Sequence, residues 1–498
     1  MDASQKSSQT GQSAAELLAA LRSLRRAVTE QADRMFRQWE DRIVRPGFRE
    51  SALNLAEYVV LRRSDLRHLQ DGLAALGLSS LGRLEGRVLA NLDAVIAALS
   101  AITGGTGEAR FPSHAQMFHG QELLKANADR LFGARTGPRQ VRLMVTLPSE
   151  AAEEPALIET LVSLGMDVVR INCAHDDAAA WGAMTRFARD AAAAAGRDVK
   201  ILMDLAGPKC RTSEVHCDEK HKRLRRDDRL FLARRAFLPL ARHPAQAICS
   251  IGSVHDHLVA GAPVWFDDGH AGGIVERLDE EGAVVLITHA PPKGVKLRAD
   301  KGLNFPETDL GVGALTEKDL TDLDFVVRHA DMVGYSFVQS AEDVARLQTE
   351  LAARCDAGAE PIGIVAKIET PRAVRNLPGI IVQAAGRQPF AVMIARGDLG
   401  VEIGFARLAE IQEEMLWLCE AAHVPVIWAT EVLDNLIKEG MPTRGEMTDA
   451  AMAARAECVM LNKGPYIADA LKILDALFVR MAEHQSKKTP RLRALQSW

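Results

Sequence analysis

The sequence predicts an α/β protein: a closed (β/α)8 (TIM) barrel, an α-helical domain before it, and a small β-domain inserted after the third barrel strand. Three observations support this fold class. After residue 140, eight short apolar segments recur, most about 30 residues apart, each followed by a helix-patterned segment. The first 130 or so residues show helical periodicity throughout, and an alternating, turn-rich stretch separates the third and fourth segments. Alternating strands and helices pair in parallel, and eight such units can close into a barrel.

Residues 1–135 are expected to form a helical extension. Residues 1–13 are rich in Ser and Gln without apolar periodicity, so disorder is expected there. From Ala14 to about Ile43, and again from Ser51, apolar residues recur at spacings of three and four. Several arginines on these helices could contact a partner, although such residues more often form a solvated face: Arg22, Arg25, Arg26, Arg62 and Arg63.

The barrel is expected to occupy residues 136–212 and 299–485, with a C-terminal tail at 486–498. Its predicted strands cover 142–147, 167–174, 199–206, 331–338, 361–369, 390–399, 424–433 and 458–463. The inserted domain is expected at 213–298, where short alternating segments are separated by turn pairs such as Asp268-Gly269 and Glu281-Gly282. This pattern predicts a small antiparallel β-domain that could act as a lid.

Composition and charge narrow the class of protein. The chain has 498 residues, with 26% charged residues and a net charge of −5, so no global field recruits nucleic acid or an anionic membrane. Its seven cysteines are scattered without a CxxC pair, which indicates reduced thiols rather than a disulfide framework. The polar N-terminus lacks the apolar core of a secretory signal, and no run of about 18 apolar residues occurs. A soluble, cytoplasmic protein is therefore expected.

Charged residues end two adjacent predicted strands. Lys367 and Glu369 close one strand and, being two residues apart, point to the same side, while Asp398 closes the next. Two carboxylates and a lysine at adjacent strand ends suit a hard divalent cation with an anionic substrate. A salt-bridge cluster that merely caps the barrel is the structural alternative.

The other strand ends carry the same kind of residue. Active sites of such barrels lie at the carboxyl ends of the strands. At least four cations surround three carboxylates there, which suits a phosphorylated, carboxylated small molecule and phosphoryl transfer. The residues at these ends include Arg170, Asn172, His175, Asp204, Lys209, Arg211, Ser336, Lys367, Glu369, Arg396, Asp398 and Thr430.

Several strings resemble the pyruvate kinase family and occur in the family's order between about residues 140 and 465. They include VVRINCAH, MDLAGPKCRT, KGLNFP, AKIET, MIARGDLGVEI and CVMLNK. The resemblance implies phosphoryl transfer between phosphoenolpyruvate and ADP, giving pyruvate and ATP. It also implies Mg2+ (or Mn2+) held by Glu369 and Asp398.

The resemblance also implies roles for the remaining residues. Lys367, Thr430 and Arg170 would be catalytic. Ser336 would hold the phosphate with Arg170, and Thr430 would hold the substrate carboxylate with the backbone near Gly397 and Asp398. Four residues would face the nucleotide: Asn172, His175, Arg211 and Lys301.

Departures from the family pattern point to a potassium-independent type. Ala174, Leu205 and Lys209 stand where potassium-dependent members have serine, threonine and glutamate, whereas Asn172 and Asp204 of the monovalent-cation site remain. The Lys209 ammonium is expected to replace K+. Residues 462–465 replace the family's SGET stretch, and the family's C-terminal domain is missing from the sequence. A homo-oligomer is expected, a dimer rather than the family tetramer.

Two other functions remain open at this point. A metal-dependent lyase or aldolase could stabilise a pyruvate enolate on the same carboxylate pair, but it would not need Arg211, Lys301 or a lid domain. A catalytically weak homologue could instead regulate a partner through the helical domain. The altered segment at 462–465 favours this second alternative, whereas the retained Lys367, Glu369 and Asp398 count against it.

Overall fold

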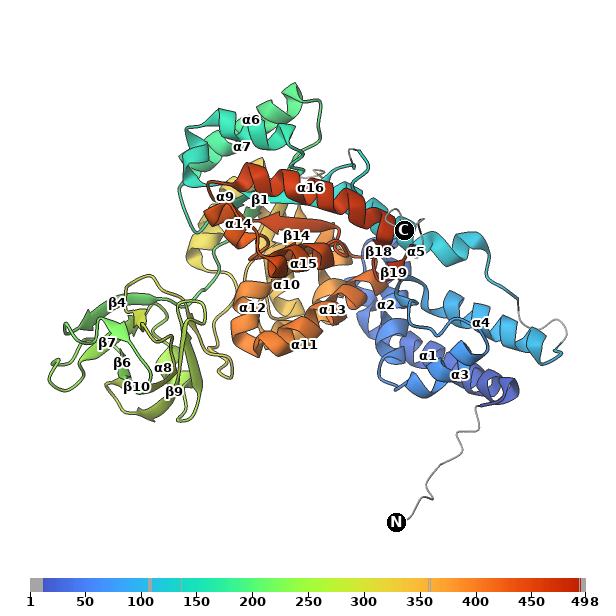
Figure 1. Cartoon of the computed structure of the whole chain (residues 1–498), viewed down its shortest axis with the longest axis horizontal. Helices are drawn as coiled ribbons and strands as arrows, with labels where there is room; N and C mark the ends of the chain where they lie inside the picture. Colours follow the sequence, from blue (N-terminus) through green and yellow to red (C-terminus); the bar gives the residue numbers. More distant parts are fainter. Residues whose placement is uncertain are drawn as a thin grey trace, which may run out of the picture.

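A computed structural model describes residues 12–105, 110–135, 137–356, 358, 360–491 and 493. Most of the segment 1–13, for which disorder is expected, lies outside these residues. Figure 1 shows the barrel in the middle of the molecule, with the inserted sheet (green) on one side and the N-terminal helices (blue) on the other.

The eight predicted barrel strands form one closed, parallel barrel, which confirms the predicted fold class. The barrel order is β1-β17-β16-β15-β14-β13-β3-β2. The strands are β1 (Arg142–Thr146), β2 (Val168–Asn172), β3 (Lys200–Asp204), β13 (Met332–Tyr335), β14 (Gly363–Ile368), β15 (Phe390–Ala395), β16 (Val426–Ala429) and β17 (Cys458–Leu461). Nearly all their residues are buried because helices cover the barrel outside and side chains fill it inside.

Helices follow the barrel strands and cover them. Several begin with side-chain caps; for example, Asp177 accepts hydrogen bonds from the backbone N–H groups of Ala179 and Ala180. The helices are α6 (Pro155–Ser163), α7 (Ala178–Ala194), α9 (Glu317–His329), α10 (Ala341–Arg354), α11 (Pro371–Ala385), α12 (Arg396–Ile403), α13 (Phe405–Ala421), α14 (Asp434–Glu439), α15 (Arg444–Ala453) and α16 (Ile467–His484).

The observed strands are shorter than the predicted ones, and one predicted strand runs into a helix. The strand expected over 390–399 ends at Ala395, and the residues after it form the short helix α12. Helix α13 follows it directly after Gly404. The charged residues Arg396 and Asp398 therefore lie in the first turn of α12, which begins at the carboxyl end of β15.

The inserted region forms a seven-stranded sheet in the order β12-β8-β9-β10-β6-β7-β4. Its strands are β4 (Thr212–Cys217), β6 (Arg229–Ala233), β7 (Ala245–Cys249), β8 (Pro263–Phe266), β9 (Ala271–Leu278), β10 (Gly282–His289) and β12 (Leu303–Asn304). The pairing is not purely antiparallel as expected, because β6 and β7 run parallel. The strands β5 (Arg223–Leu224) and β11 (Val295–Lys296) pair separately, and the helix α8 (Val254–His257) follows β7.

The N-terminal region is helical, as the periodicity predicts. Its helices are α1 (Ala14–Trp39), α2 (Arg49–Leu61), α3 (Arg67–Ala75), α4 (Val88–Ile102) and α5 (His114–Phe132). Ser13 caps α1 in a capping box with Glu16. The arginines of the predicted solvated face are partly engaged: Arg25 pairs with Asp93, and Arg62 lies over the Trp417 ring of the barrel helix α13.

The end of α5 closes the amino end of the barrel. Leu131 and Phe132 are buried in the same cluster as inward-facing strand residues such as Leu202 and Val365. A Cβ added at Gly363, the first residue of β14, would lie 2.6 Å from Leu131 Cδ2. The helical extension therefore packs at the end of the barrel opposite the strand ends that carry the candidate site.

The sequence predicts reduced thiols and no membrane-spanning helix. All seven cysteines are described, and all are free thiols. Among the described residues, no helix combines the length and the apolar character needed to cross a membrane.

Candidate active site

A buried ion pair lies at the carboxyl ends of β2 and β3. Arg170 donates to Asp204 Oδ2 from Nε at 2.9 Å and from Nη2 at 2.5 Å. It also donates to Thr146 Oγ1 at 3.0 Å. Asp204 is fully buried and Arg170 is only 9% exposed. Burial would raise the pKa of Asp204, but the charges of Lys367 and Arg170 outweigh it and hold that pKa below its ordinary value.

Lys367, at the end of β14, connects this pair to Glu369. Its Nζ donates to Ser336 Oγ at 2.8 Å and lies 3.1 Å from Glu369 Oε1 and 3.4 Å from Asp204 Oδ2. Burial would lower the pKa of Lys367, but the charges of Asp204 and Glu369 outweigh it and raise that pKa. The lysine is therefore an ammonium at neutral pH, as an electrostatic role requires.

The Glu369 carboxylate is held by a backbone N–H group that follows the neighbouring strand β13. Its Oε2 accepts a hydrogen bond from the Phe337 N–H at 2.6 Å, and the residue is 2% exposed. Phe337 has a φ of 55°, a left-handed conformation that turns this N–H toward the carboxylate. Burial raises the pKa of Glu369, and the charge of Asp398 raises it further, whereas Lys367 opposes both. The structure therefore brings Glu369 and Asp398 close enough to interact electrostatically.

Lys209 lies beside Asp398. Its Nζ is 2.9 Å from Asp398 Oδ1 and 3.2 Å from Asp268 Oδ1, the latter in the turn between β8 and β9. Within the described part of the chain, Lys209 forms no ion pair with Asp204 and no hydrogen bond with Asn172. Burial would lower the pKa of Lys209, but Asp398 and Asp268 outweigh it and raise it. The expected substitution of K+ by this ammonium stays a prediction.

The start of α12 contacts the loop after β16. Thr430 Oγ1 accepts a hydrogen bond from the Gly397 N–H at 2.8 Å. Arg396 donates to the carbonyl oxygens of Ala429 at 3.0 Å and Thr430 at 2.5 Å. Thr430 has a φ of 64°, so this contact network stabilises a backbone conformation that is unfavourable for a threonine.

The four predicted nucleotide residues form two separate pairs. Arg211 and Lys301 lie at the base of the inserted sheet, where Arg211 Nη1 is 3.4 Å from Asp300 Oδ1 and Lys301 Nζ is 2.7 Å from Asp267 Oδ1. Asn172 accepts a hydrogen bond from the Ala174 N–H at 3.1 Å, and His175 is exposed. Across the described residues, no hydrogen bond or ion pair joins one pair to the other.

Comparison with known proteins identifies the family. A family profile described as "Pyruvate kinase, barrel domain" matches residues 138–468, which include the closed barrel and the inserted sheet. The chain belongs to the pyruvate kinase family. The candidate cluster therefore lies at the strand ends of a pyruvate kinase barrel domain.

Named relatives are similar over about 70% of this chain. A pyruvate kinase of Geobacillus stearothermophilus is 31% identical over 369 residues, covering 72% of this chain and 60% of the relative. "Pyruvate kinase 2" of Synechocystis sp. is 29% identical over 359 residues, covering 70% of this chain and 57% of the relative. A pyruvate kinase of Mycobacterium tuberculosis (strain ATCC 25618 / H37Rv) is 30% identical over 359 residues, covering 71% and 72%. The chain thus spans less than two thirds of the first two relatives.

Two carboxylates at the pyruvate kinase strand ends fit a divalent cation. Glu369 and Asp398 supply hard oxygen donors, and Mg2+ usually binds through one or two carboxylates together with substrate oxygens and water. Of the described residues, no group of three or more His, Cys, Asp and Glu could hold a metal ion. Two carboxylates suit a cation whose remaining ligands are substrate oxygens and water.

Sequence reasoning missed Glu402, which faces the same region. Asn304, from β12 of the inserted sheet, donates to Glu402 Oε1 at 3.1 Å. Burial raises the pKa of Glu402 to about 7, and the charge of Asp398 contributes. Asp398 and Glu402 are four residues apart, so both lie on one side of α12. Had a helix been predicted there instead of a strand, this spacing would have grouped them.

The segment at 462–465, which departs from the family pattern, packs against α14. A Cβ added at Gly464 would lie 2.5 Å from Ile437 Cγ2, so no larger residue fits there. Tyr466 donates its N–H to Ile437 O at 3.1 Å. In the described structure, neither Asn462 nor Lys463 forms a side-chain hydrogen bond with the strand-end cluster. Gly464 and Tyr466 therefore pack closely against α14.

Proposed function

We propose that the protein transfers a phosphoryl group between phosphoenolpyruvate and ADP, giving pyruvate and ATP, with Mg2+ or Mn2+ bound by Glu369 and Asp398. The observation that carries this proposal is the buried Lys367 ammonium, which contacts Glu369, Ser336 and Asp204 at adjacent strand ends. Membership of the pyruvate kinase family supports the same reaction.

The chain's own residues would provide positioning and charge. Phosphoryl transfer depends mainly on positioning and electrostatic stabilisation. Lys367 would stabilise the phosphoryl group as it leaves the enolate oxygen, since the ammonium is fixed by three contacts before substrate arrives. Ser336 and Arg170 would hold the phosphate. The divalent cation, when bound, would neutralise charge on the phosphoryl oxygens.

Thr430 would hold the substrate carboxylate together with the backbone near Gly397 and Asp398. The Gly397–Thr430 hydrogen bond supports this role because it fixes the hydroxyl at the start of α12. A carboxylate near a helix N-terminus is also favoured by the local dipole. Nucleotide contacts by Arg211, Lys301, Asn172 and His175 would require the inserted sheet to close toward the barrel, as a lid does.

Lys209 would make the reaction independent of K+, since a fixed ammonium beside Asp398 already supplies a monovalent positive charge. We further propose that the protein acts in the cytoplasm as a homo-oligomer, a dimer rather than a tetramer. We also propose that residues 1–135 form the helical extension, that residues 136–212 and 299–485 form the catalytic barrel domain, and that residues 486–498 form a tail. Residues 213–298 would act as the lid.

The test is pyruvate formation from phosphoenolpyruvate and ADP with Mg2+, measured with and without K+. Turnover in both conditions supports the kinase and the role of Lys209. Turnover only with K+ supports the kinase but contradicts the role of Lys209. Binding of phosphoenolpyruvate without turnover contradicts the proposed reaction and favours the regulatory alternative.

A further inference from the structure

A cavity of about 680 Å³ lies in the helical extension, where it meets the barrel at His423, away from the strand-end cluster. Residues of α1, α2, α4 and α5 line it, together with His423, which precedes β16. None of the residues placed in the candidate active site lines it. Its volume is within the usual range for small-molecule sites.

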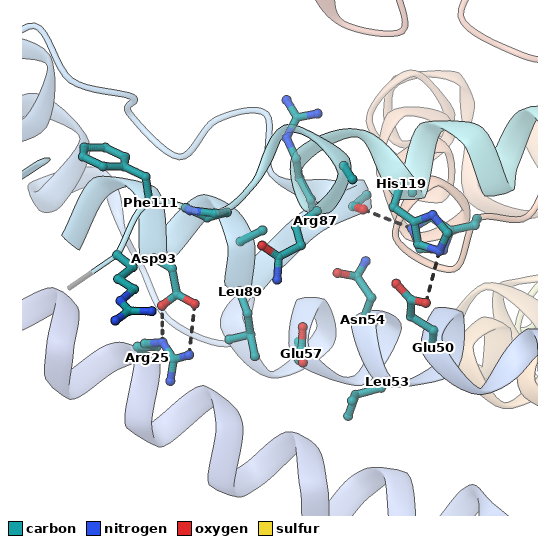
Figure 2. Close-up of a pocket in the computed structure, with 18 residues that line it drawn as sticks. Arg25, Glu50, Leu53, Asn54, Glu57, Arg87, Leu89, Asp93, Phe111 and His119 are labelled. Carbon is teal, nitrogen blue, oxygen red and sulfur yellow. Dashed lines mark hydrogen bonds and ion pairs between the residues drawn. The ribbon is translucent and has the colours of Figure 1, made fainter. Parts of the chain in front are cut away.

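Glu57 is a buried carboxyl group in the wall of this cavity. It is 6% exposed and lies between Leu53, Leu89 and Asn54 (Figure 2). Throughout the described residues, no cation forms an ion pair with Glu57. The Leu89 N–H donates a hydrogen bond to it, but an N–H group does not carry the full positive charge that would balance a carboxylate. A buried carboxylate without a counter-ion is unfavourable, so this position is suited to an added positive charge.

Two basic residues of the cavity wall, Arg25 and His119, already have acidic partners. Arg25 makes a two-point ion pair with Asp93, with Nη2 to Oδ2 at 3.0 Å, and His119 Nε2 lies 3.2 Å from Glu50 Oε2 (Figure 2). Burial raises the pKa of Glu57 to about 8. Asp33 and Asp93 raise it further, and Arg25 opposes them. Of the charged groups that act on Glu57, Asp33 and Asp93 are therefore acidic and only Arg25 is basic.

The polar groups next to Glu57 are also satisfied. Asn54 donates to Glu85 O and Ala421 O, both at 2.7 Å, and accepts from the Val88 N–H at 2.9 Å. The lining also includes the apolar residues Leu53, Leu89 and Ala90, and Leu53 and Leu89 lie next to Glu57 (Figure 2). A ligand that matches this surface carries one positive charge next to an apolar body.

We propose that this cavity binds a small organic molecule whose primary ammonium pairs with Glu57 and whose apolar part packs against Leu53 and Leu89. Arg87 and Arg110 also line the cavity, so a carboxylate on the same molecule can be accommodated. The ligand is therefore either a simple amine or an amino acid, and the ammonium is the shared requirement.

Three probes of equal ring size separate these ligands: phenethylamine, L-phenylalanine and 3-phenylpropanoate. Their binding to the full chain is measured by calorimetry at up to 10 mM. Binding of phenethylamine, with or without L-phenylalanine, supports a simple amine site. Binding of L-phenylalanine alone supports an amino acid site. Binding of 3-phenylpropanoate alone, or of no probe, overturns the proposal.

Glu57→Gln tests the ammonium contact directly. It should weaken binding of the amine probe at least tenfold, because it removes the charge and keeps the shape. Glu30→Gln is the matched control: it removes the same charge from α1, outside the cavity lining, and should change affinity less than twofold. Equal binding by wild type and Glu57→Gln overturns the proposal. Thermal unfolding and pyruvate formation check that both variants are folded.

Proton release gives an independent readout. Pairing an ammonium with Glu57 requires the carboxyl group to lose its proton, so affinity should increase at least tenfold between pH 6 and pH 8. Calorimetry in buffers of different ionisation enthalpy should detect a released proton at pH 6.5 in wild type and none in Glu57→Gln. Binding without proton release in wild type contradicts a contact with Glu57.

Discussion

The Lys209 ammonium lies 2.9 Å from Asp398 Oδ1, and so links the loop after β3 to the start of α12. The same ammonium reaches Asp268 of the inserted sheet at 3.2 Å. Lys209, which is expected from the sequence to replace K+, therefore contacts both a candidate metal ligand and the inserted sheet. Lys209 therefore connects the charge of Asp398 in the candidate site with the position of the inserted sheet.

Lys209→Gln should lower kcat/KM for phosphoenolpyruvate about tenfold or more, because a fixed positive charge near the developing negative charge is lost. Asp268→Asn is the comparison. Its carboxylate is 65% exposed, so its contact with Lys209 contributes less than about 1 kcal/mol, and activity should change less than about threefold. Steady-state assays in Na+ and in K+ buffers measure both. Equal effects of the two substitutions would contradict a special role for Lys209.

Asp398→Asn and Glu369→Gln should each lower turnover about 10³-fold, since each removes a carboxylate of the proposed metal pair. Both variants should remain folded by circular dichroism, and Mn2+ binding measured by electron paramagnetic resonance should weaken in parallel. Asp309→Asn is a control, because that carboxylate pairs with Arg372 at 2.6 Å on the surface. Full activity in either metal-pair variant would refute the assignment.

Asp204→Asn should destabilise the fold by about 3–5 kcal/mol, because it leaves the buried Arg170 with no carboxylate partner and Lys367 with one fewer. Glu276→Gln breaks an exposed pair with Arg229 and should cost less than about 1 kcal/mol. Urea unfolding compares the two free energies. Similar values for both variants would show that burial does not strengthen the effect at Asp204.

Gly120→Ala should loosen the helical extension from the barrel. An added Cβ would lie 2.0 Å from Gly86 O and 2.4 Å from His423 Nε2, and such overpacking costs about 1–3 kcal/mol. Gly445→Ala is a matched control inside helix α15, where an added Cβ would lie an ordinary 3.9 Å from Thr443 Oγ1. Limited proteolysis should cleave the first variant faster than wild type. Unchanged cleavage would mean that the contact region adapts.

Glu57→Gln should make the protein more stable than wild type at alkaline pH. Glu57 has a pKa of about 8 when folded and an ordinary value of 4.5, so the folded state retains a proton that the unfolded state loses between these values. The stability of wild type relative to the variant should fall by about 1.4 kcal/mol per pH unit in that range and then level off. Chemical denaturation at pH 5, 7 and 9 measures this difference. A constant difference would contradict the raised pKa.

Much of the barrel could be predicted because its signals are local. Apolar segments such as Ile364–Ala366 alternate with amphipathic helices, and parallel strands bring their carboxyl ends to the same side of a barrel. The grouping of Lys367 with Glu369 follows from their spacing of two along a strand. The strand predicted over 390–399 was too long because the residues after Ala395 form a helix that contacts the loop after the next strand, and the apolar residues Leu399 and Val401 belong to that helix.

The sequence by itself therefore determined the order of strands and helices, the family, and the set of charged residues at the strand ends. Only the tertiary structure decided which charges meet. Lys209 and Asp398 are far apart in the chain, as are Glu402 and Asn304, and no local periodicity links them. The cavity around Glu57 likewise depends on how helices of the extension pack against His423. Local patterns specify single elements, whereas the pairing of buried charges depends on the packing between elements.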